Sequence, residues 1–165
     1  MWLLRPVRLK ECANLWQFIR RILTQQFLVK ILVAIPLALL IPEDTSTQPD
    51  FILQDPLFAL IAILILAPIF ETLVLQSLTI ESFRLLRRSR VAQFIAGMLP
   101  FAALHFFSGV HVGVAAGIVG GIFFSHAYLE CRERSWWTST KVTAATHFFH
   151  NLIVAPIAFI AAFAS

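Results

Sequence analysis

The chain has 165 residues, of which 59% are hydrophobic and 13% are charged, and its mean hydropathy is +0.81. This composition exceeds what the core of a small soluble domain needs and predicts an integral membrane protein. The net charge of +4 is not gathered into a groove of basic and aromatic residues. We therefore expect contact with a lipid bilayer and no nucleic-acid partner.

Taken in chain order, the first 21 residues mix basic side chains with leucine, phenylalanine and tryptophan, which predicts an amphipathic segment at the membrane interface. Five apolar runs follow, at about residues 25–41, 56–80, 91–107, 110–129 and 141–163. Each approaches the roughly 20 residues that cross a bilayer core. No repeat or linker divides the chain. The sequence predicts one all-α domain, residues 1–165, built as a polytopic bundle of about five transmembrane helices.

The distribution of basic residues predicts the orientation. Lysine and arginine concentrate in the N-terminal segment and in the loops after the second and fourth runs, with Lys30 just inside the first run, whereas residues 42–55 carry only acidic charges. The positive-inside rule then places the N-terminus in the cytoplasm and the C-terminus outside. Cys12 and Cys131 fall on the cytoplasmic side, where thiols stay reduced, so we predict no disulfide.

The fourth apolar run has a regular glycine spacing, with Gly109, Gly113, Gly117 and Gly121 each four residues apart. Small residues at this spacing let helix backbones approach closely in lipid. The run is therefore expected to be a tightly packed helix that holds its neighbours in place.

Four of the polar side chains inside the apolar runs have residue types suited to a catalytic site. Glu71 is in the second run, and an ionisable group in a bilayer costs about 2.5 kcal/mol or more, so such groups are rarely kept without a partner or a task. His105 lies in the third run. His147 and Asn151 lie four residues apart in the fifth, on one helix face. We expect these three helices to converge on one pocket.

The four side chains have the chemistry of a hydrolytic site. A carboxylate in an apolar environment is a stronger base, so Glu71 can activate a water molecule that His105 orients. His147 and Asn151 can donate hydrogen bonds to the oxyanion that forms when water attacks an amide carbonyl. Two alternatives are open: a zinc ion held by Glu71, His105 and His147, or a haem held by paired histidines.

Three segments resemble the motifs of a known family: Glu-Thr-Leu-Val-Leu-Gln at 71–76, Phe-Ala-Ala-Leu-His at 101–105 and His-Phe-Phe-His-Asn at 147–151. They are similar, in this order, to those of the CAAX-processing and bacteriocin-processing (CPBP, or Abi) intramembrane proteases. The resemblance covers residues 65–155 and implies a catalytic core there. It implies a glutamic endopeptidase that needs no cofactor and cleaves the tail, leader or C-terminal sorting signal of a membrane-anchored protein or peptide, in a bacterial cytoplasmic membrane.

The chain departs from this family at two positions. Thr72 and Gln76 stand where the family has a glutamate and an arginine, and we expect them to brace the site through neutral hydrogen bonds. Phe101 and His150 are expected to support the site by packing. Loss of the charged pair leaves a second function open, that of a catalytically silent bacteriocin-immunity or scaffold protein.

Counting residues along the predicted helices raises a problem of depth. At about 1.5 Å per residue, Glu71 and His147 fall in the cytoplasmic half of the bilayer and His105 falls nearer the outer face. A tilted third helix, or one that begins near Pro100, would bring the three together.

Overall fold

The computed structural model describes residues 14–41 and 51–164, and every regular element in these ranges is helical. The all-α prediction is confirmed. Helix α1 (Leu15–Leu40) is followed by the short α2 (Phe51–Gln54). In chain order, the others are α3 (Pro56–Ile61), the π-helical turn η2 (Ala62–Leu66), α4 (Ala67–Glu71), the π-helical turn η3 (Thr72–Leu78), α5 (Thr79–Leu85), α6 (Arg90–Phe106), α7 (Val110–Val112), the π-helical turn η4 (Gly113–Ile118), α8 (Val119–Arg132) and α9 (Trp136–Ala164).

Within residues 14–41 and 51–164, four stretches of helix are long and apolar enough to cross a membrane: Leu15–Leu40, Pro56–Leu85, Val110–Arg132 and Trp136–Ile160. The fifth predicted span is the shorter apolar helix α6, whose 17 residues extend about 25 Å. A bilayer core is about 30 Å thick, so α6 is short for a span. Large apolar side chains point outward from the bundle, as on α1, where Leu39 is 81% exposed. The length and exposed apolar surface of these helices indicate a polytopic membrane protein.

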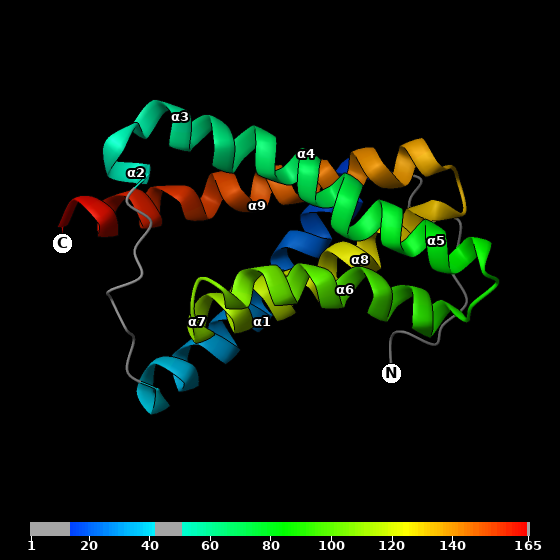
Figure 1. The fold of residues 1–165 in the computed structure, drawn as a ribbon, viewed down its shortest axis with the longest axis horizontal. Helices are drawn as coiled ribbons and strands as arrows, with labels where there is room; N and C mark the ends of the chain where they lie inside the picture. Colours follow the sequence, from blue (N-terminus) through cyan, green and yellow to red (C-terminus); the bar gives the residue numbers. More distant parts are fainter. Residues whose placement is uncertain (1–13, 42–50, 165) are drawn as a thin grey trace.

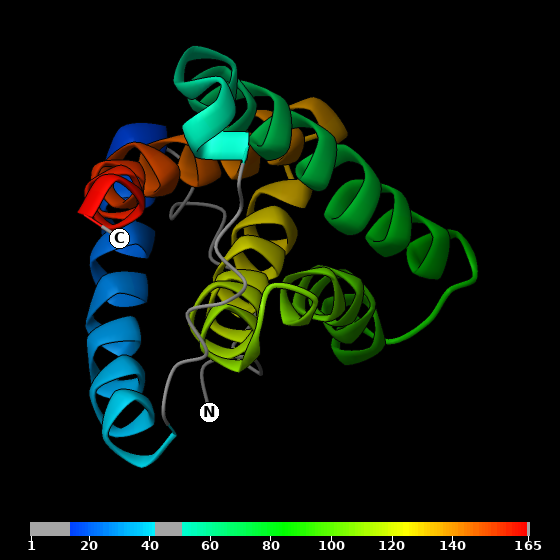
Figure 2. The ribbon, with the colours of Figure 1, turned by 60° about the vertical axis from the view of Figure 1, so that its left-hand side comes forward.

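Helix α8 packs against both α6 and α9, and the continuous helix from Pro56 to Leu85 runs beside α9 (Figure 1). Helix α1 packs against α8 and α9 with its first half, where all its buried residues lie between Phe18 and Gln26. Its second half diverges from α9 (Figure 2).

The last part of the predicted interfacial segment lies within the described residues, where it is helical. Residues 15–21 form the first turns of α1, which begins after Asn14, whose side chain accepts a hydrogen bond from the Gln17 amide at 3.1 Å. The apolar side chains Phe18 and Ile19 are buried in a core cluster with α8 and α9. Trp16 on the same turns is 52% exposed, so this part of the segment packs in the bundle on one face only. Residues 1–13 lie outside the described ranges.

The glycine spacing has the predicted effect. A Cβ atom added at Gly117 would lie 2.9 Å from the carbonyl oxygen of Ala102, and one at Gly121 would lie 3.0 Å from that of Met98. Both distances are shorter than ordinary contacts, so η4 and α8 touch the backbone of α6 directly. The absence of side chains at these positions sets how closely α6 approaches.

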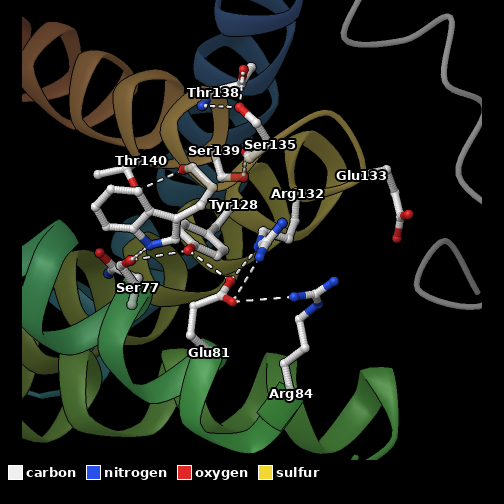
Figure 3. Close-up of polar contacts among 12 residues, drawn as sticks. Ser77, Glu81, Arg84, Tyr128, Arg132, Glu133, Ser135, Thr138, Ser139 and Thr140 are labelled. Atoms are coloured by element: carbon white, nitrogen blue, oxygen red, sulfur yellow. Dashed lines mark hydrogen bonds and ion pairs between the residues drawn. The ribbon is translucent and has the colours of Figure 1, made fainter.

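A chain of hydrogen bonds closes one end of the bundle (Figure 3). The Trp136 indole donates to the Ser77 hydroxyl at 2.8 Å, Ser77 lies 3.0 Å from the Tyr128 hydroxyl, and Tyr128 donates to Glu81 at 3.0 Å. Arg132 donates to both carboxylate oxygens of Glu81. Because these residues come from η3, α5, α8 and α9, the network fixes the helices relative to one another.

The prediction of reduced thiols is wrong for Cys131, which is fully buried in α8 and is disulfide-bonded. Cys12 lies outside the described residues. The prediction was based on compartment alone, which does not determine which sulfur atoms folding brings together.

Candidate functional site

Glu71 lies in an irregular part of its helix. It ends α4, the short stretch between the π-helical turns η2 and η3. Pro68 in α4 has no backbone N–H and interrupts the regular hydrogen-bond ladder, and wide π-helical turns are frequent at functional sites. The Glu71 side chain is 14% exposed, and its Oε2 atom has no hydrogen-bond partner within the described ranges. The local sequence thus places a carboxylate without a hydrogen bond to Oε2 inside the bundle.

Asn151 is positioned by the same irregularity. The Ala67 amide donates to the carbonyl of Ala62 in the π-helical register, and Pro68 has no N–H to donate to the carbonyl of Ile63. The Asn151 side-chain amide donates to that Ile63 carbonyl at 2.8 Å. Asn151 therefore ties α9 to the helix that carries Glu71. One of its two amide hydrogens is left for another partner.

His147 lies next to Glu71. Its Nε2 atom lies 3.9 Å from Glu71 Oε2, and the ring is 3% exposed. Phe124 stacks on this ring with centroids 4.5 Å apart, and Phe101 meets it edge-on at 5.6 Å. The 3.9 Å separation exceeds an ordinary hydrogen bond, as catalytic contacts often do before a substrate binds.

His105 also contacts Phe101. The two rings stack with centroids 4.5 Å apart, and Nδ1 of His105 lies 2.9 Å from the Phe101 carbonyl. Nδ1 must carry the hydrogen in this bond, so Nε2 is an acceptor in the neutral ring. Since Phe101 contacts both His105 and His147, these two histidines lie near one another in the bundle.

A cavity of about 610 Å³ lies between the diverging half of α1 and helices α6, α7, α8 and α9, together with η4. Among the described residues, its polar lining consists of six side chains: Lys30, His105, His111, His147, His150 and Asn151. Glu71 is not among the lining residues, and His147 is the lining side chain that contacts it. The cavity is thus separate from the carboxylate but reaches its imidazole partner.

The structure adds Lys30 to the predicted set. Its Nζ lies 2.8 Å from Nε2 of His150, so a lysine on α1 meets the histidine that was expected only to pack. A signal for this residue was present in the sequence. Lys30 is a charged side chain inside an apolar run, and the argument applied to Glu71 applies equally to it.

Thr72 and Gln76 are fully buried, but the expected bracing contacts are not seen. Thr72 Oγ1 and both amide atoms of Gln76 have no hydrogen-bond partner in the part of the chain that the structure describes. Within that same part, no three His, Cys, Asp or Glu side chains are grouped as a metal site. The zinc set of Glu71, His105 and His147 is therefore not assembled in this arrangement.

The structure thus brings Glu71, His147 and His105 into one neighbourhood, with Asn151 one helical turn from His147. Comparisons of the chain with protein-family models, with curated proteins and with solved structures find no match. The resemblance to the CPBP proteases rests on the three motifs alone.

Proposed function

We propose that this protein is an intramembrane endopeptidase that hydrolyses a peptide bond of a membrane-associated protein or peptide with water activated by Glu71. The observation that carries the proposal is the contact of the Glu71 carboxylate with His147, 3.9 Å apart inside an apolar bundle. A carboxylate and an imidazole at this distance can share the proton of an attacking water. The adjoining cavity gives a substrate a route to His147, His105 and Asn151.

Each residue has a role that follows from its contacts. Glu71 takes the proton from water as general base, and His147 beside it passes that proton towards the leaving amine. His105 offers Nε2 as an acceptor that orients the water, since Nδ1 is bound to the Phe101 carbonyl. The amide hydrogen of Asn151 that is not bound to Ile63 is left to stabilise the oxyanion.

The proposed setting is a bacterial cytoplasmic membrane, with the N-terminus in the cytoplasm. The mechanism uses no metal ion. Substrates of the resembled family are tails, leaders and sorting signals of membrane-anchored proteins, and we propose the same class here.

The test is a cleavage assay in liposomes with a library of fluorescence-quenched peptides, each containing one apolar span. We expect Glu71→Gln and His147→Gln to reduce cleavage by about 10²-fold or more, since general-base catalysis contributes about 10²–10⁴-fold. Glu133→Gln is the matched control, because this carboxylate lies at the end of α8 with its side chain 55% exposed. Added chelator should leave cleavage unchanged. Undiminished cleavage by Glu71→Gln would refute the glutamate mechanism.

A second candidate is a catalytically silent immunity or scaffold protein. The observation that favours it is the pair Thr72 and Gln76, which replaces the charged pair of the resembled family and is buried without hydrogen bonds among the described residues. For this function, Glu71→Gln should protect cells from a bacteriocin as well as the unaltered protein does. Protection that requires Glu71 would point back to hydrolysis.

A further inference from the structure

The Lys30 ammonium can donate more hydrogen bonds than the one it makes to His150. An ammonium group has three hydrogens and accepts no hydrogen bond, so Lys30 donates one hydrogen to Nε2 of His150, at 2.8 Å. His150 is then the tautomer that carries its hydrogen on Nδ1. Two ammonium hydrogens of Lys30 are left for another acceptor at the cavity that this side chain lines.

His150 holds the lysine in a fixed position. Its ring is 4% exposed and stacks on Phe27 with centroids 5.1 Å apart, and Phe124 meets it edge-on at 6.0 Å. Rings packed on two sides have little freedom to turn. The ammonium is therefore directed by a rigid neighbour, which is the arrangement expected of a binding group rather than of a lysine extended towards water.

Among the described residues, the cavity lining holds one lysine, no arginine and no acid. Lys30 is that lysine, and the other polar lining groups in the described part of the chain are four histidines and Asn151. The remaining lining is apolar or aromatic, including Ile31, Ala34, Val112, Val154 and Ile157. The volume of about 610 Å³ falls within the range of about 300–1,000 Å³ that small-ligand sites have. Such a lining is complementary to one negative charge on an apolar body.

We propose that this cavity binds a single-chain amphiphile with one carboxylate, and that Lys30, positioned by His150, holds the carboxylate. One ammonium with two free hydrogens can pair with one carboxylate, whereas phosphate binding usually recruits arginine or several donors. This proposal places a ligand next to the proposed catalytic residues, because the ligand would lie against His105 and His147. It does not depend on hydrolysis, since Glu71 does not line the cavity.

The test is saturation binding of radiolabelled palmitate to the purified chain in maltoside micelles, with hexadecanol and hexadecyl phosphate as competitors. We expect palmitate to bind saturably and hexadecanol to bind at least tenfold more weakly, because it lacks the charge. Lys30→Met should weaken palmitate binding about tenfold or more and leave hexadecanol binding unchanged, which also shows that the variant is folded. Lys30→Arg, which keeps the charge, should retain most of the palmitate affinity.

Lys141→Met is the matched control, because Lys141 is exposed on α9 beside the Trp137 ring and does not line the cavity. It should bind palmitate like the unaltered chain. Glu71→Gln should also bind palmitate normally even though cleavage is lost, so failure of the two proposals can be told apart. The inference is overturned if Lys30→Met keeps full palmitate affinity, if hexadecanol binds as tightly as palmitate, or if hexadecyl phosphate binds more tightly.

Discussion

One carboxylate at the end of the bundle contacts two arginines in different surroundings, which allows an internal comparison. Glu81 accepts hydrogen bonds from Nε and a terminal nitrogen of Arg132, and both side chains are 18% exposed. The same carboxylate lies 3.5 Å from Arg84, whose side chain is 48% exposed, one helical turn away. Figure 3 shows the two guanidinium groups approaching Glu81 from different helices.

The expected coupling energies follow from this difference. A hydrogen bond to a charged group contributes about 1.5–3 kcal/mol when it is shielded, and a bidentate pair is stronger than a single contact. Exposed ion pairs contribute about 0.2–1 kcal/mol, because water and salt screen them and both side chains lose freedom. We therefore expect a coupling of about 2 kcal/mol between Glu81 and Arg132, and less than about 1 kcal/mol between Glu81 and Arg84.

Two double-mutant cycles measure these energies, with Glu81→Gln combined in turn with Arg132→Met and Arg84→Met. The free energy of unfolding would be obtained from loss of helical circular dichroism as SDS is added to mixed micelles. Each cycle isolates the pairwise interaction from the other effects of the substitutions. Equal couplings, or a larger one for Arg84, would show that burial does not set the strength of this network.

Two further predictions concern packing and topology. Gly117→Ala should lower the free energy of unfolding by about 1–3 kcal/mol, because its new Cβ would lie 2.9 Å from a backbone carbonyl of α6. An unchanged free energy of unfolding would mean that η4 and α6 are not in direct contact. In a background without Cys12 and Cys131, a membrane-impermeant maleimide should label Ser108→Cys in intact cells and should label Arg87→Cys only after permeabilisation. The reverse pattern would contradict the proposed orientation.

Helix content and most helix positions could be predicted from the sequence, because in a bilayer each backbone must satisfy its own hydrogen bonds. Apolar length alone therefore located the helices that begin at Pro56, Val110 and Trp136 to within a few residues. The start of α1 was missed by about ten residues. There the basic residues that suggest an interface share a helix with apolar residues that pack in the core.

The candidate site was predicted in part for the same reason. Ionisable side chains inside apolar runs are costly in free energy, so Glu71, His105 and His147 could be singled out from the sequence. The fold places them in one neighbourhood. Lys30 is also an ionisable side chain inside an apolar run, but its role as a binding group depends on its contact with His150, which lies 120 residues away in the sequence. No local pattern encodes a contact over that distance.

Composition and residue order thus determined that this protein is a helical membrane bundle and which polar side chains lie within it, since hydrophobic length and the cost of buried charge are properties of single segments. Tertiary structure alone decided that His147 contacts Glu71, that Asn151 binds the carbonyl beside Pro68, and that α1 diverges to leave a cavity. These features depend on how closely glycine-bearing helices approach and on which faces they present, and both are set only when all the helices pack together.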